Sequence, residues 1–205
     1  MKLVPIVALL AGCAPDIASI HTWNNGDSRE PAVIDTSDTG LFVVETRVTT
    51  TPGPDGVMHT VVDAQDALRW VGVDFDAGAA VGQLDSEPGW DLKLMRSDIA
   101  LNGGVSGTGG AEALFLEGQA LEAVTTAPTE GYTVDQPDDD DDNDKPELVF
   151  EVWFDYDGAT HILSPHPGTF VLRSTEGRHY AIAVRSFYDT AGTSAVLSLD
   201  WKELL

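Results

Sequence analysis

The sequence contains a single cysteine, Cys13, among its 205 residues. No intramolecular disulfide can therefore form, which excludes the small disulfide-stabilised scaffolds of many secreted proteins. Basic residues are also scarce, because 11 lysines and arginines stand against 34 aspartates and glutamates, giving a formal net charge of −23. A negative field of this size repels phosphate backbones and anionic headgroups, so we expect neither a nucleic-acid partner nor a basic membrane-binding surface.

Long apolar runs and helical periodicity are missing as well. No segment keeps an apolar repeat of 3.6 residues over the length of a globular helix, and only residues 64–69 and 119–124 could form a helical turn. Short alternating runs bounded by glycine, proline and asparagine are frequent instead. They predict an all-β domain, a single antiparallel sandwich or rolled sheet with little helix, over residues 41–205.

We expect strands wherever an alternating run lies between turn residues. These runs are residues 41–50, 57–62, 70–75, 92–95, 98–101, 113–116, 148–156, 161–163, 169–173, 180–187 and 195–201. The turn residues of the segment Pro52–Gly56 join the first two runs into a hairpin.

The N-terminal residues predict the cellular compartment. Residues 1–12 have the short charged and apolar regions of a secretory signal peptide, too short to span a bilayer as a stable helix. The sequence Leu10–Cys13 matches a lipobox, so Cys13 is the predicted lipidation site and the only predicted membrane attachment. Ala14 favours the outer membrane, and residues 13–40, rich in polar residues and glycine, form a predicted tether. We therefore expect an extracytoplasmic outer membrane lipoprotein.

Residues 135–147 carry eight carboxylates in thirteen positions. Such a run repels itself and cannot pack into a core, so we predict an acidic loop insertion at residues 136–147. A calcium-dependent adhesion module is a hypothesis that rests on this run alone, since oxygen ligands select Ca²⁺. The spacing lacks the glycine and the glutamate of an EF-hand loop.

Several sequence blocks follow one another in a specific order between residues 61 and 201. They are Val62–Ala64, Trp70, Phe75, Gly89–Leu92, Arg96, Asp98–Gly104, Pro128–Asp135, Phe170–Arg173, Tyr180, Phe187–Asp189 and Trp201. In this order they resemble the HmuY family of haem-binding bacterial surface lipoproteins. Each block also has a structural interpretation, with Trp90 as a core aromatic residue and Asp91 with Arg96 as a partly buried ion pair.

The resemblance implies a lipoprotein that scavenges haem b, or another porphyrin, for iron acquisition and passes it to an outer-membrane haem receptor. It also implies two histidine ligands, one in the loop after the Gly131–Val134 motif and one in a hairpin soon afterwards. Here the loop at 136–147 contains no histidine, methionine or tyrosine, and the second position falls near Tyr156.

The candidate axial ligands of haem are therefore substitutes, namely Tyr156, His161 and His166, because phenolate and imidazole both bind haem iron. His161 could equally be a packing residue and His166, between two prolines, an exposed turn residue. Met95 and Met58 are possible soft ligands, although a methionine in an alternating strand is usually core filler. No other metal ligand is assigned.

Two further function classes remain to be weighed. One is a lipoprotein of the same fold that does not ligate haem and acts as a protein-binding or glycan-binding surface module. The other is an enzyme, which we do not expect, because Ser106 lies in an incomplete Gly-x-Ser-x-Gly motif with Thr108 in place of the second glycine.

Overall fold

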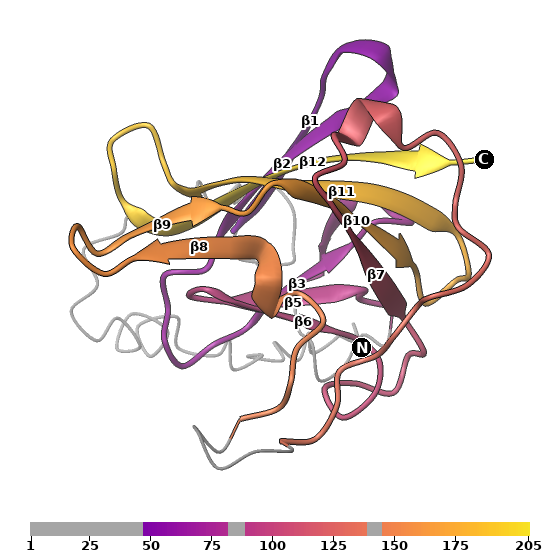
Figure 1. Cartoon of the computed structure of the whole chain (residues 1–205), viewed down its shortest axis with the longest axis horizontal. Helices are drawn as coiled ribbons and strands as arrows, with labels where there is room; N and C mark the ends of the chain where they lie inside the picture. Colours follow the sequence, from indigo (N-terminus) through magenta and orange to yellow (C-terminus); the bar gives the residue numbers. More distant parts are fainter. Residues whose placement is uncertain (1–46, 82–88, 139–144) are drawn as a thin grey trace, which may run out of the picture. The chain divides into compact units, whose positions relative to one another are not determined.

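The computed structural model describes residues 47–81, 89–138 and 145–205. Nearly all regular structure in this part of the chain is antiparallel β-sheet (Figure 1). Three short 3-10 helices complete it: η2 (Pro54–Gly56), η3 (Leu121–Ala123) and η4 (Glu151–Trp153). None of the described helices has the length and apolar character to cross a membrane.

The largest sheet has six strands in the order β1-β2-β12-β11-β10-β7. They are β1 (Val48–Pro52), β2 (Met58–Asp63), β7 (Glu112–Glu117), β10 (Gly168–Arg173), β11 (His179–Tyr188) and β12 (Ser194–Leu204). Strict alternation along β12 turns Leu197, Leu199 and Trp201 inward. Strand β11 is irregular after Val184, where its register with β12 shifts.

A second sheet has four strands in the order β4-β3-β5-β6, and a separate hairpin has two. The four are β3 (Val71–Asp74), β4 (Ala79–Val81), β5 (Leu92–Met95) and β6 (Asp98–Leu101), and the hairpin consists of β8 (Phe154–Asp157) and β9 (Ile162–Pro165). Figure 1 shows this hairpin, in orange, beside β11.

One hydrophobic cluster joins the six-stranded and four-stranded sheets. Leu92, Leu94, Ile99 and Leu101 enter it from the smaller sheet, and each is at most 1 % exposed. Aromatic rings fill the rest, such as Phe75, which meets Trp201 edge to face at 5.1 Å between centroids. Burying one such large side chain stabilises the fold by about 1.5–3 kcal/mol. A smaller cluster around Leu121 packs against the other face of the six-stranded sheet.

The prediction of an all-β antiparallel fold is confirmed, and most predicted strands are present within two residues of their expected ends. The strand expected at residues 148–156 is wrong in its first half. Phe150 and Trp153 are both buried, and this spacing of three residues suits the 3-10 helix η4. The Trp153 indole donates a hydrogen bond to the carbonyl of Ser97 at 2.8 Å, which fixes the turn before β8 begins.

Other differences are smaller. Residues 64–69 form no helix, and residues 119–124 form only the single turn of η3. Strand β4 was not predicted from the sequence. The predicted signal peptide, Cys13, the tether and residues 41–46 of the first strand lie outside the described residues, as do residues 139–144 of the acidic run.

Candidate functional site

A groove of about 510 Å³ lies on the side of β5 and β6 that is turned away from the core. Leu92 and Leu94 of β5 point into the core, so Lys93 and Met95 point to the opposite face. Residues just before β3, after β6 and before β8 form the walls. The lining residues are Trp70, Lys93, Met95, Ser97, Asp98, Ile99, Ala100, Val105, Ser106, Lys145, Pro146, Leu148, Glu151 and Phe154. Its volume lies in the usual range for a small-molecule site.

The groove combines an apolar surface with two ammonium groups. Lys93 Nζ lies 5.1 Å from the ring centroids of both Trp70 and Trp90 and donates a hydrogen bond to the Ser106 carbonyl at 2.7 Å. Burial lowers the pKa of Lys93, and the nearby Asp135 carboxylate opposes this shift. Lys145 lies at the rim, 3.6 Å from Asp98. These ammonium groups, beside apolar side chains and the Asp98 and Glu151 carboxylates of the same lining, suit an amphipathic ligand with an anionic group.

Asp135, the last residue of the motif at 128–135, holds the groove walls together. Its carboxylate accepts hydrogen bonds from the amides of Leu101 at 2.8 Å and Val149 at 3.0 Å. Its carbonyl accepts the amide of Val105 at 3.1 Å. Burial raises the pKa of Asp135, and the Val149 amide opposes this shift. Asp135 therefore ties the segment before β8 to the loop after β6.

The Asn102–Gly104 motif shapes the same loop. Asn102 donates its side-chain amide to the Trp90 carbonyl at 2.7 Å and accepts the Gly109 amide at 2.9 Å. Gly104 has a φ of +61°, and a Cβ atom there would lie 1.9 Å from the Asp135 carbonyl oxygen. Only glycine permits this approach. These motif residues therefore build the scaffold of the groove.

The ion pair expected between Asp91 and Arg96 is wrong. Arg96 donates instead to the Gln65 carbonyl at 3.2 Å. Asp91 is fully buried, and its oxygens accept the amides of Phe75 at 2.9 Å and Thr175 at 2.8 Å. Proximity in the sequence misled the prediction, because Arg96 lies in the turn between β5 and β6 with a φ of +57°.

The β8–β9 hairpin brings two of the predicted haem ligands together. The Tyr156 phenol oxygen and the His161 Nδ1 atom lie 2.5 Å apart, and the two rings have centroids 6.0 Å apart. Both side chains are exposed. The turn between them is fixed by Asp157, whose carboxylate accepts the Ala159 amide at 2.9 Å and the Thr160 hydroxyl at 2.6 Å. The phenol–imidazole pair is therefore preformed.

Tyr156 lies on the strand face that continues from the groove. Phe154 lines the groove, and Tyr156, two residues further along β8, shares its face. Leu163 pairs with Tyr156 across the hairpin and packs on the core, and its amide donates to the Tyr188 hydroxyl at 3.2 Å. The hairpin is thus anchored at the Tyr156–Leu163 pair, while the turn beyond it is exposed.

His166 lies apart from this pair. Its Nδ1 atom is 2.9 Å from the carboxylate of Asp155, which faces the opposite side of β8 from Tyr156. His161 and His166 flank the two ends of β9, so their backbones are separated by roughly 16 Å of extended chain. Two histidines at such positions do not clamp one iron atom from opposite sides.

Sequence reasoning missed most of the groove. Met95, which the alternating pattern suggested as core filler, is half-buried in the groove instead, whereas Met58 packs against the core. No local pattern in the sequence predicts that Lys145 and Leu148 line the groove. Their segment reaches the groove through the contacts of Asp135.

Comparison with known proteins identifies the family. The model of the HmuY protein family matches residues 66–201. This match covers more than half of the chain, so the chain belongs to the HmuY family, and the resemblance inferred from the sequence blocks is confirmed. No curated protein matches the sequence.

Solved structures support the same fold. The apo HmuY analog TFO of Tannerella forsythia has a TM-score of 0.58 at 14 % identity, over 77 % of this chain and 97 % of that chain. A Bacteroides vulgatus protein described as HmuY-like and haem-binding has a TM-score of 0.54 at 20 % identity, over 74 % and 94 %. A Bacteroides fragilis protein described as a lipoprotein has a TM-score of 0.56 at 18 % identity, over 74 % and 91 %.

Proposed function

We propose that this chain binds haem b or a related porphyrin in the groove beside β5 and β6, as a lipoprotein that serves iron acquisition. The observation that carries the proposal is the pairing of an apolar groove with Lys93 and Lys145 in a strongly acidic protein. Haem is a flat apolar ring with two carboxylates. Its ring suits the side chains of Met95, Leu148 and Phe154, and its carboxylates suit the two ammonium groups. Membership of the HmuY family, and a relative described as haem-binding, support the same ligand class.

Tyr156 is the axial ligand that we propose, with His161 as its partner. A tyrosine binds iron as phenolate, and the imidazole nitrogen 2.5 Å from the phenol oxygen is placed to take the proton. Bound haem supplies the iron, while the chain binds and orients the ring and accepts this proton. His161 is the second candidate for direct ligation. His166 is the third, and it is less suited because it faces Asp155 on the other side of the hairpin.

The proposed haem-binding function also implies a cellular compartment and a partner protein. We propose that the signal peptide at residues 1–12 is removed, that Cys13 is lipidated, and that the protein is held at the outer membrane by this lipid. A scavenged porphyrin then requires a receptor that imports it, so an outer-membrane haem receptor is the proposed partner. A binding role rather than an enzymatic one agrees with the absence of a complete catalytic motif in the sequence.

Titration of the purified chain with haemin, followed by the Soret band, tests the proposal. The wild type should show a saturable Soret shift at micromolar haemin. Leu148→Glu places a carboxylate in the groove and should weaken binding at least tenfold, because it repels the haem carboxylates and is costly to bury. Leu205→Glu makes the same change at a fully exposed position and should leave binding unchanged.

The wild-type result decides between haem binding and the alternative. If haemin produces no saturable shift, the haem proposal is wrong, and a surface module that binds protein or glycan becomes the preferred function. If both glutamate variants bind as the wild type does, haem binding stands but the groove is not its site.

A further inference from the structure

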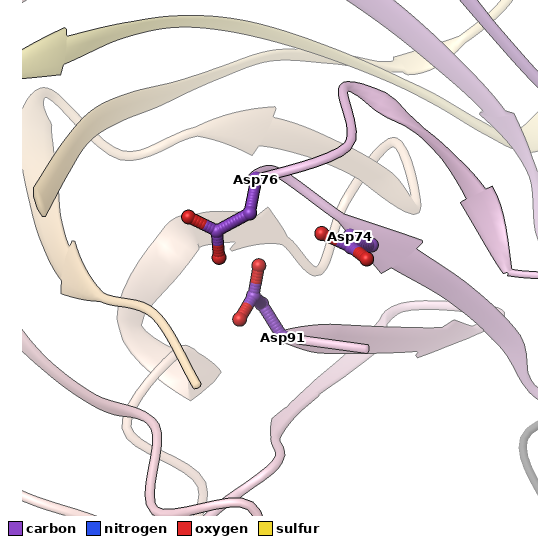
Figure 2. A group of neighbouring side chains, drawn as sticks. All are labelled: Asp74, Asp76 and Asp91. Carbon is purple, nitrogen blue, oxygen red and sulfur yellow. The ribbon is translucent and has the colours of Figure 1, made fainter. Parts of the chain in front are cut away.

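Three aspartates from two separate segments meet at one end of the four-stranded sheet. Asp74 ends β3, Asp76 follows in the next turn, and Asp91 immediately precedes β5. One carboxylate oxygen of each lies within 4.8 Å of those of the other two, and Figure 2 shows the three groups facing a common space. None of these residues lines the proposed haem groove.

The fold holds these side chains in place. The Asp91 amide donates to the Val73 carbonyl at 2.8 Å, which aligns the start of β5 with the end of β3. Asp74 accepts the Ala77 amide at 2.9 Å, and Asp76 accepts the Tyr180 hydroxyl at 2.9 Å through Oδ1. The site is therefore preorganised by backbone and aromatic contacts.

The charges of the cluster are not balanced by the residues around it. Among the described residues, Arg178 is the cation in contact with the cluster, and its Nη1 atom lies 3.4 Å from Asp76 Oδ1. Its Nε and Nη2 atoms donate instead to Glu203, at 2.9 and 2.5 Å. This guanidinium is thus shared between Asp76 of the cluster and Glu203 outside it.

One oxygen of the cluster has no hydrogen-bond partner among the residues that the structure describes. The Asp76 side chain is only 4 % exposed, yet its Oδ2 atom accepts no hydrogen bond. A buried carboxylate oxygen without a partner is costly, because it has lost its water and gained nothing in return. A cation in the space between the carboxylates would satisfy this oxygen and offset the excess charge.

We propose that Asp74, Asp76 and Asp91 bind a Ca²⁺ ion. Hard cations select oxygen ligands, and two oxygens that bind one Ca²⁺ lie at most about 5 Å apart, twice the bond length of 2.3–2.6 Å. The separation within 4.8 Å meets this limit without rearrangement. Mg²⁺ suits the site less well, since it requires regular octahedral geometry and gives up its water reluctantly. The ion would link β3, β5 and, through Tyr180 and Thr175, the β10–β11 hairpin.

Calorimetric titration and thermal unfolding of the chelator-treated full-length chain test this site. With Ca²⁺ the wild type should bind one ion with saturation and unfold several degrees higher, because a ligand of the folded state stabilises it. Asp76→Asn and Asp74→Asn should each bind at least tenfold more weakly. A variant with residues 138–142 and 144 changed to asparagine should keep the response, because the acidic run is not the site. Tb³⁺ luminescence excited through Tyr180 should be strong in the wild type and in the acidic-run variant, and weak in Asp76→Asn and Asp74→Asn.

Each opposite result overturns the proposal. It fails if Ca²⁺ produces no shift in the wild type, or if the asparagine variants respond as the wild type does. It fails if the acidic-run variant abolishes binding, which would assign the ion to that run. An equal response to Mg²⁺ would overturn the assignment to calcium. If Asp76→Asn is more stable than the wild type and Ca²⁺ has no effect, a shared proton balances the cluster instead.

Discussion

Tyr156 and His161 illustrate how much a single hydrogen bond can change the interpretation of a residue. In the sequence the two residues stand five positions apart and neither has a distinctive context. In the structure a tight turn places the imidazole against the phenol oxygen at 2.5 Å. A phenol paired in this way is a better ligand than an isolated one, because the proton that it must release has an acceptor.

Replacing Tyr156 should therefore have the largest effect on haem binding. Tyr156→Phe removes the ligand oxygen and should weaken haemin binding at least tenfold, with loss of the high-spin tyrosinate spectrum. His161→Ala should weaken binding less and keep that spectrum, since the oxygen remains. His166→Ala is the matched control and should leave both affinity and spectrum unchanged. Absorption spectra of the haemin complexes measure all three, and equal binding by the three variants would refute the ligand assignment.

Asp135 permits a prediction about pH. Asp135→Asn should lower the free energy of unfolding by about 1–3 kcal/mol, because buried amides lose an acceptor. The folded chain holds the Asp135 proton more tightly than the unfolded chain, whose carboxyl has the ordinary pKa of 3.8. This contribution to stability is fully present below that pH and is lost as the pH rises through the raised pKa of the folded state. The loss caused by Asp135→Asn should therefore be smaller at neutral pH than at about pH 4.

Urea unfolding of the wild type and of Asp135→Asn across this pH range measures the effect. A difference in stability that stays constant with pH would contradict the assignment of the shift to Asp135.

The elements of this fold were largely predictable because their boundaries carry turn residues. The hairpins β1–β2 and β10–β11 each have a turn signal between two alternating runs, and each is present. The segment at 148–153 was mistaken for a strand because a compact run with Phe150 and Trp153 suits either structure. Only the packing of both rings into the core selects the 3-10 turn.

Substitutions at two glycines in the loop after β6 test how this loop supports the groove. Gly104→Ala should destabilise the chain by about 1–3 kcal/mol, because its φ is +61° and the added Cβ meets the Asp135 carbonyl oxygen. Gly110→Ala is the matched control, since Gly110 has a φ of +79° but nothing within 4 Å of the new atom. Because both glycines have a positive φ, the difference between the two losses of stability measures the cost of the contact between the new Cβ atom at position 104 and the Asp135 carbonyl oxygen. Thermal unfolding measures stability, and equal losses would attribute the whole effect to backbone conformation.

At the scale of the whole molecule, the sequence predicted the sheet class better than the site. Alternation and turns are local signals, whereas the groove depends on contacts between residues far apart, such as Asp135 with Leu101. The Asp74, Asp76 and Asp91 cluster has the same origin, because β3 and β5 are adjacent only in the folded sheet. The family resemblance implies a ligand class but not the residues that would bind it, since the expected histidines are absent from their positions.

The last prediction concerns membrane attachment of the whole chain, which we propose to depend on a single residue, Cys13. The net charge of −23 repels anionic headgroups, and the lipobox at Leu10–Cys13 predicts a lipid on Cys13, which we propose as the membrane attachment. Cys13→Ala should release the protein into the soluble fraction while the folded domain keeps its haemin and Ca²⁺ responses. Fractionation after salt washing measures the release. A Cys13→Ala chain that still sediments with membranes would mean that another part of the molecule, or a partner protein, holds it there.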